Sequence, residues 1–124
     1  MSENKEYVSQ TLDNGAIHIS SEVIVSIAAM AAQDVEGVYG LGTGADLNML
    51  KKKSASKEIR VEISENDEIS IDCYIIVLYG YSVVDVAKAV QEAVASTVES
   101  TTGRVVADVN VSIGGISLPR DAKK

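Results

Sequence analysis

The chain lacks phenylalanine and tryptophan altogether, and it has one cysteine, one histidine and one proline among its 124 residues. A core must therefore be built from aliphatic side chains, with some of the five tyrosines, since hydrophobic residues still make up 46% of the sequence. A single cysteine excludes an internal disulfide and is typical of a reducing compartment. Such a length predicts one domain that buries roughly two thirds of its unfolded surface without staples.

Long apolar runs and basic segments are also scarce. No stretch approaches the ~20 apolar residues of a membrane-spanning helix, and the first fifteen residues lack the basic and apolar regions of a signal peptide. The formal charge of −7 repels nucleic acid and anionic lipid over the protein as a whole. We therefore expect a cytoplasmic protein with no direct membrane insertion and no nucleic-acid partner.

The hydrophobic periodicity predicts a clear order of elements. Residues 1–14 are polar and unpatterned, and they predict a flexible tail ending at the Asn14-Gly15 turn signal. A short strand around Ile17 and Ile19 precedes a helix capped by Ser20 or Ser21, which runs to about Val35. Gly37 ends that helix, and a brief strand over 38–41 follows.

The second half of the chain contains a hairpin, a second helix and a last strand. Residues 42–56 form a variable loop, and alternating residues over 59–63 and 69–79 predict an antiparallel hairpin. An amphipathic helix follows from Ser82 to Gly103, and the final strand over 105–113 is broken by two glycines before a C-terminal tail over 117–124. The expected fold is α+β, a two-layer α/β sandwich with a mixed sheet of four to five strands and both helices on one face. Its order is β-α-β-β-β-α-β, and the single domain spans 15–116.

One face of this sheet has no helix to cover it. If Ile71, Cys73, Ile75 and Val77 point at the helices, then Tyr74, Ile76 and Leu78 point away from them, and Val106 shares that parity. An apolar patch on an open sheet face predicts a protein contact or self-association surface formed by Tyr74, Ile76, Leu78 and Val106. Alternatively, the tail or the 42–56 loop folds back over it.

Candidate catalytic groups are few. His18 has no Cys, His or carboxylate cluster near it in sequence, so an exposed strand histidine is expected. Cys73 lies in the inward parity of its strand, which favours a buried, unreactive thiol over a nucleophile. We predict no catalytic residue, no cofactor and no metal, and thus no enzyme.

Two glycine patterns leave an alternative open. Gly40-x-Gly42-x-Gly44, followed by Lys51 to Lys53, resembles part of a phosphate loop but lacks its Gly-Lys-Ser/Thr ending. Gly37 to Gly40 matches the GXXG turn with which KH domains clamp a nucleotide backbone, although Asp34 and Glu36 beside it have the wrong charge. An RNA-binding module using the Gly37–Gly40 turn and Lys51–Lys53 is the alternative.

Three segments carry a resemblance to a known family: GAIHISSEVIVSIAAMAAQDVEGVYG, IDCYIIVLYGYSVVDVAKAVQEAVASTVESTTG and VVADVNVSIGGI. From Gly15 to about Ile116, the chain resembles the alkaline shock protein family, also called the Gls-type general stress proteins, of Gram-positive bacteria. The resemblance implies a small acidic protein without catalytic residues, associated with alkaline and cell-envelope stress.

Some members of that family are held at the inner face of the membrane by a separate anchored partner, and others are linked to the regulation of lipid metabolism. For this chain the resemblance implies a non-enzymatic interaction protein in envelope homeostasis. It would bind a protein partner, which could be membrane-anchored, and would form a homo-oligomer.

Overall fold

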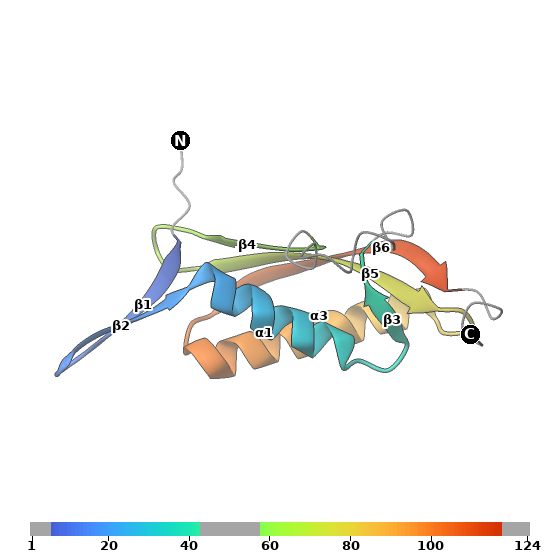
Figure 1. The fold of residues 1–124 in the computed structure, drawn as a ribbon. Helices are drawn as coiled ribbons and strands as arrows, with labels where there is room; N and C mark the ends of the chain where they lie inside the picture. The colour runs from blue at the N-terminus through green and yellow to red at the C-terminus, as the bar shows by residue number, and fades with distance from the viewer. Residues whose placement is uncertain (1–5, 43–57, 118–124) are drawn as a thin grey trace.

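The computed structural model describes residues 6–42 and 58–117, which form an α+β fold of two layers. The elements are β1 (Tyr7–Leu12), β2 (Gly15–Ser20), α1 (Ser21–Gln33), β3 (Val38–Leu41), β4 (Ile59–Ile63), β5 (Ile69–Leu78), α3 (Val83–Thr102) and β6 (Val106–Ser117). Both helices lie on one side of the main sheet (Figure 1). The predicted sandwich with its two helices on one face is confirmed.

Strand β5 is the centre of the main sheet. It pairs in parallel with β6 along its whole length, from Ile69↔Val106 to Leu78↔Ser117. On its other edge it pairs antiparallel with β4 over residues 69–73 and with β3 over residues 75–77. The sheet is therefore mixed, as predicted, and β3 and β4 share one edge of the central strand.

Serine caps begin both helices where the sequence predicts them. The Ser20 hydroxyl accepts a hydrogen bond from the Val23 amide, and the Ser82 hydroxyl accepts one from the Asp85 amide. Helix α3 ends at Gly103, whose φ of +76° is the left-handed conformation of a glycine C-cap. Helix α1 ends at Gln33, two residues before the predicted end.

The core is aliphatic, as the missing large aromatics require. Its centre is formed by isoleucines and valines of β5 packed against α3, whose buried positions recur at every fourth residue: Val86, Val90, Val94 and Val98. Four of the tyrosines are at least 40% exposed at the surface of the body: Tyr39, Tyr74, Tyr79 and Tyr81. Tyrosine therefore contributes surface rather than core.

The predicted flexible tail over 1–14 is wrong for residues 7–12, which form β1. This strand pairs antiparallel with β2 from Tyr7↔Ser20 to Leu12↔Gly15, and the resulting hairpin projects from the body (Figure 1). Its base is fixed because Val8 is fully buried and Gln10 Nε2 donates to the carbonyls of Thr102 and Gly103 at the end of α3. The actual order is thus β-β-α-β-β-β-α-β.

The end of the domain also differs from the prediction. Gly114 and Gly115 do not break the last strand, because a shift in register between Ile75↔Ile113 and Ile76↔Gly115 absorbs one extra residue as a β-bulge. Strand β6 continues to Ser117, which the sequence assigns to the tail. The rest of that tail and most of the 42–56 loop lie outside the described residues.

Candidate functional site

Tyr74 lies at the middle of β5, on the sheet face opposite the helices, and its side chain is 43% exposed. It borders a polar hollow of about 270 Å³ on that face. The described side chains that line the hollow come from three neighbouring strands and the residue before β4: Glu58, Arg60, Asp72, Tyr74, Asn110 and Ser112. We define these six residues as the sheet-face site.

Strand register brings the polar groups of this site together. Arg60 and Asn110 are the two cross-strand partners of Asp72, so a guanidinium, a carboxylate and an amide form one row across β4, β5 and β6. Asn110 Nδ2 donates to Asp72 Oδ1 over 2.9 Å. The site therefore offers hydrogen-bond donors and acceptors beside an aromatic ring, a combination common at protein contacts.

Ile76 and Leu78 do not share the exposure of Tyr74. Ile76 is only 3% exposed and Leu78 is half-buried. Ile76 sits on the central strand between Gly40 of β3 and Gly115 of β6. Parity gives the direction of a side chain but not what lies over it, so the prediction that Ile76 is open to solvent is wrong.

Val106 is expected on the outer face from its parity, and this is also wrong. It pairs with Ile69, whereas Asp108 pairs with Ser70, so Ala107 is the extra residue of a β-bulge. The bulge reverses the parity of what precedes it, and Val106 packs against the helix-side core. It also lies at the opposite end of β5 from Leu78. The four predicted contact residues therefore do not form one patch.

The two candidate reactive side chains are placed as predicted. His18 is exposed on β2, where its ring stacks on Tyr7 with the ring centroids 4.5 Å apart. Cys73 is fully buried, and this burial, with a smaller effect from the nearby Asp72 carboxylate, raises the pKa of its thiol from 9.0 to about 12. A thiol in that state is a poor nucleophile at neutral pH.

The Gly37 to Gly40 turn serves packing. A Cβ at Gly37 would lie 2.7 Å from Cγ2 of Val86 and 2.9 Å from Cδ2 of Tyr81. Gly40 lies inside β3, paired with Ile76, and the Glu36 carboxylate accepts a hydrogen bond from the Tyr81 hydroxyl. Lys51 to Lys53, the other half of the RNA-binding hypothesis, lie outside the described residues.

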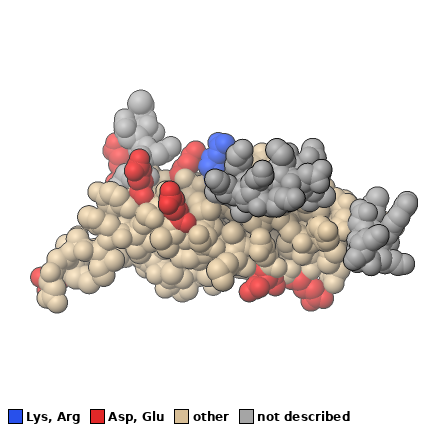
Figure 2. All heavy atoms as spheres, in the orientation of Figure 1, with Lys and Arg blue, Asp and Glu red and all other residues tan. Residues whose placement is uncertain are grey.

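Charge on the described surface is mostly negative. Acidic side chains lie on both the sheet side and the helix side of the view in Figure 2. The basic side chains of residues 6–42 and 58–117 are Arg60, Lys88 and Arg104, and Arg104 forms an ion pair with Asp67 at 2.9 Å. Within these ranges, no group of three or more His, Cys, Asp or Glu side chains is arranged to bind a metal.

Sequence reasoning missed two surface features. The first is the β1–β2 hairpin, which the Asn14-Gly15 pair could have signalled as a turn between two strands. The second is a groove of about 460 Å³ between α3 and β6, lined by Gln91, Glu92, Ala95, Val106, Ala107, Asp108, Val109 and Asn110. No local pattern signals that groove, because it depends on the spacing between two elements.

The sequence matches known proteins over nearly all of the described fold. The model of the alkaline shock protein family, described as having a cell envelope-related function, matches residues 9–118. The chain belongs to the alkaline shock protein family. The resemblance seen in the sequence is thus confirmed, and the family match begins inside β1, so the hairpin is part of the family's domain.

Relatives of this alkaline shock protein domain include two Bacillus subtilis (strain 168) proteins. YloU is 37% identical over 109 residues, covering 84% of this chain and 90% of YloU. YqhY is 32% identical over 114 residues, covering 89% of this chain and 83% of YqhY. Among solved structures, a variant of the MamM CTD has a TM-score of 0.50 at 22% identity, covering 77% of this chain and 94% of that domain. That likeness concerns the fold alone.

Within the described part of this alkaline shock protein domain, neither helix has the length and apolar character needed to cross a bilayer.

Proposed function

We propose that this member of the alkaline shock protein family is a non-enzymatic interaction protein in cell-envelope stress homeostasis. It acts through contacts with a protein partner and with further copies of itself. The family supplies the envelope-related role. The contact mechanism rests on the sheet-face site, where Tyr74 is exposed among charged and amide side chains.

The composition of the sheet-face site supports a protein contact. Tyrosine and arginine are enriched at binding hot spots, because each joins a large contact area to directional hydrogen bonding. Tyr74 and Arg60 lie on neighbouring strands of this face, and the Asn110–Asp72 hydrogen bond fixes the polar row beside them. A partner that covers the face gains apolar area from the ring and directional bonds from the row.

We propose a cytoplasmic location for the protein, at the inner face of the membrane when a membrane-anchored partner binds it. Such a protein could support envelope integrity directly or through enzymes of lipid metabolism. Its negative net charge favours a protein tether over direct attraction to anionic lipid.

Replacement of Tyr74 by glutamate tests this proposal. Sedimentation velocity of the purified protein and affinity co-purification from a Gram-positive cell should both show weaker association for Tyr74→Glu. A matched variant, Tyr79→Glu, changes a tyrosine that is 63% exposed outside the sheet-face site and should behave like the wild type. If both variants associate as the wild type does, the sheet face is not the contact surface.

A further inference from the structure

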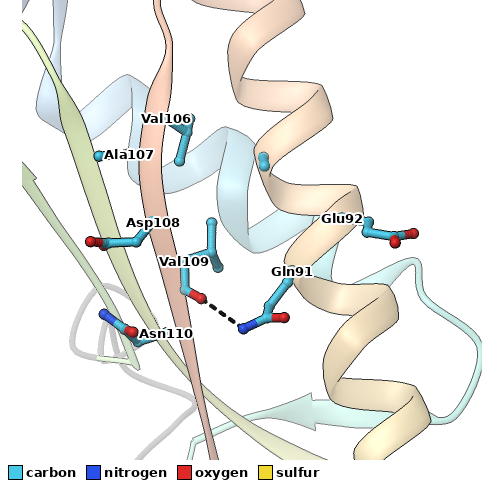
Figure 3. Close-up of a pocket in the computed structure, with 8 residues that line it drawn as sticks. Gln91, Glu92, Val106, Ala107, Asp108, Val109 and Asn110 are labelled. Carbon is cyan, nitrogen blue, oxygen red and sulfur yellow. Dashed lines mark hydrogen bonds between the residues drawn. The ribbon is translucent and has the colours of Figure 1, made fainter.

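Strand β6 forms an open edge of the main sheet. In the described part of the chain it pairs only with β5, while α3 runs beside its other edge and contributes the far wall of the 460 Å³ groove. Figure 3 shows Val106 and Val109 pointing from β6 toward the helices, with Ala107, Asp108 and Asn110 on the opposite side of the strand. The groove floor is therefore aliphatic, and one of its walls is backbone.

The main-chain groups of this edge are directed into the groove. The Val109 carbonyl accepts a hydrogen bond from Gln91 Nε2 at 3.0 Å, so it points away from β5 and toward α3. Main-chain groups alternate in direction along a strand, so those of Val111 share this orientation. An extended segment laid along β6 would meet the same donors and acceptors that β6 presents to any neighbouring strand.

Two side chains of α3 occupy positions that such a segment would fill. Gln91 donates to the Val109 carbonyl, and Glu99 Oε2 accepts from the Val106 amide at 2.9 Å. One acts as the N–H and the other as the C=O of an absent neighbour. Both side chains are exposed and can rotate away, so an incoming backbone can replace them.

The side chains around the groove determine which segment fits. Residues of an added strand alternate between the two faces. One set would enter the space lined by Ala95, Val106 and Val109, which suits small aliphatic side chains. The other set would lie on the side of Asp108, and Glu92 lines the same groove from α3, so these positions suit lysine or arginine.

We propose that the groove between α3 and β6 binds an extended peptide segment of a partner protein, with alternating aliphatic and basic residues, by adding it as a strand to the β6 edge. This inference rests on the proposed function as a contact protein, but it uses a surface separate from the sheet-face site around Tyr74. Strand addition supplies affinity through the main chain and specificity through alternate side chains.

The test uses the full chain and a defined probe. Acetylated, amidated Lys-Val-Lys-Val-Lys-Val-Lys is titrated into ¹⁵N-labelled protein, and a second peptide with the same side chains carries N-methyl groups at the valines. We expect amide shifts at residues 106–111 and 91–95 with a Kd of roughly 1 mM or tighter for the first peptide. The methylated peptide, which lacks those main-chain donors, should leave these amides unshifted.

Charge reversal provides the matched variant. Asp108→Lys should weaken binding of the lysine peptide about tenfold and favour a Glu-Val peptide, whereas Asp34→Lys, which changes net charge equally at an exposed residue after α1, should not. Equal shifts with both lysine peptides, or no shifts at residues 106–111, would overturn the proposal. So would shifts there on concentrating the protein alone, which would identify a second copy as the occupant. All three results would leave the Tyr74→Glu experiment unaffected.

Discussion

At Gly37 the backbone φ is +98°, and a Cβ added there would lie 2.7 Å from Cγ2 of Val86, a buried core side chain. Gly37→Ala combines a left-handed backbone with overpacking, so we expect it to lower the free energy of unfolding by about 2 to 4 kcal/mol. Urea denaturation measures this change. Gly15→Ala is the control, because its φ is +140° but nothing lies within 4 Å of the added Cβ. Equal losses for both variants would show that packing around Gly37 is unimportant.

Cys73 gives the fold a dependence on alkaline pH. Its pKa rises from 9.0 to about 12 on folding because the thiol is buried. Below pH 9 both states keep the proton, so stability is unaffected. Above pH 9 the unfolded chain loses the proton while the folded chain keeps it, so the free energy of unfolding falls by up to about 1.4 kcal/mol per pH unit.

Urea denaturation between pH 8 and pH 10 measures this slope. Cys73→Ala should be less stable at pH 8, since it leaves a cavity, yet it should lose less stability on going to pH 10 than the wild type does. Parallel pH profiles for the two proteins would be the contrary result.

Among single residues, the sequence predicts direction better than environment. The burial of Cys73 and the exposure of Tyr74 follow from strand alternation alone. Val106 could not be placed in this way, because one extra residue at Ala107 reverses parity and no residue type announces a bulge there. Ile76 points as predicted for its strand position, but its burial depends on groups far away in sequence.

At the scale of elements, the β1–β2 hairpin is the main departure from the sequence prediction. Val8→Ala should cost about 2 kcal/mol, because Val8 is fully buried in the core. Leu12→Ala, on the same strand but 54% exposed, should change stability by less than about 0.5 kcal/mol. Thermal unfolding of both variants compares them. A Val8→Ala protein as stable as Leu12→Ala would mean that residues 7–12 do not pack against the body.

Elements with long periodic patterns were predictable, and short ones were not. Helix α3 has apolar residues at every fourth position and a serine cap, so both its existence and its face follow from the sequence. Strand β1 has one buried residue, Val8, and its other anchors are polar contacts such as Ser9 N to Asp67 Oδ2 across 58 residues. Tertiary contacts of this kind leave no local periodicity.

At the scale of the whole molecule, the two layers leave two distinct surfaces for contacts. The helices cover one face of the sheet, the sheet-face site lies on the other, and the β6 edge lies beside α3 (Figure 1). The layer arrangement could be predicted from the order of elements. The grouping of Arg60, Asp72 and Asn110 could not, since it depends on the register between three strands.

Site-specific photo-cross-linking in growing Gram-positive cells tests most directly whether this alkaline shock family protein works through its sheet face. A benzophenone amino acid replaces Tyr74 in one strain and Met30 in another, because Met30 is 69% exposed on α1, in the other layer. After irradiation, adducts are identified by mass spectrometry. The account predicts a discrete protein adduct, or a cross-linked second copy, from position 74 and none from position 30. No adduct at position 74, or the same adducts from both positions, would contradict it.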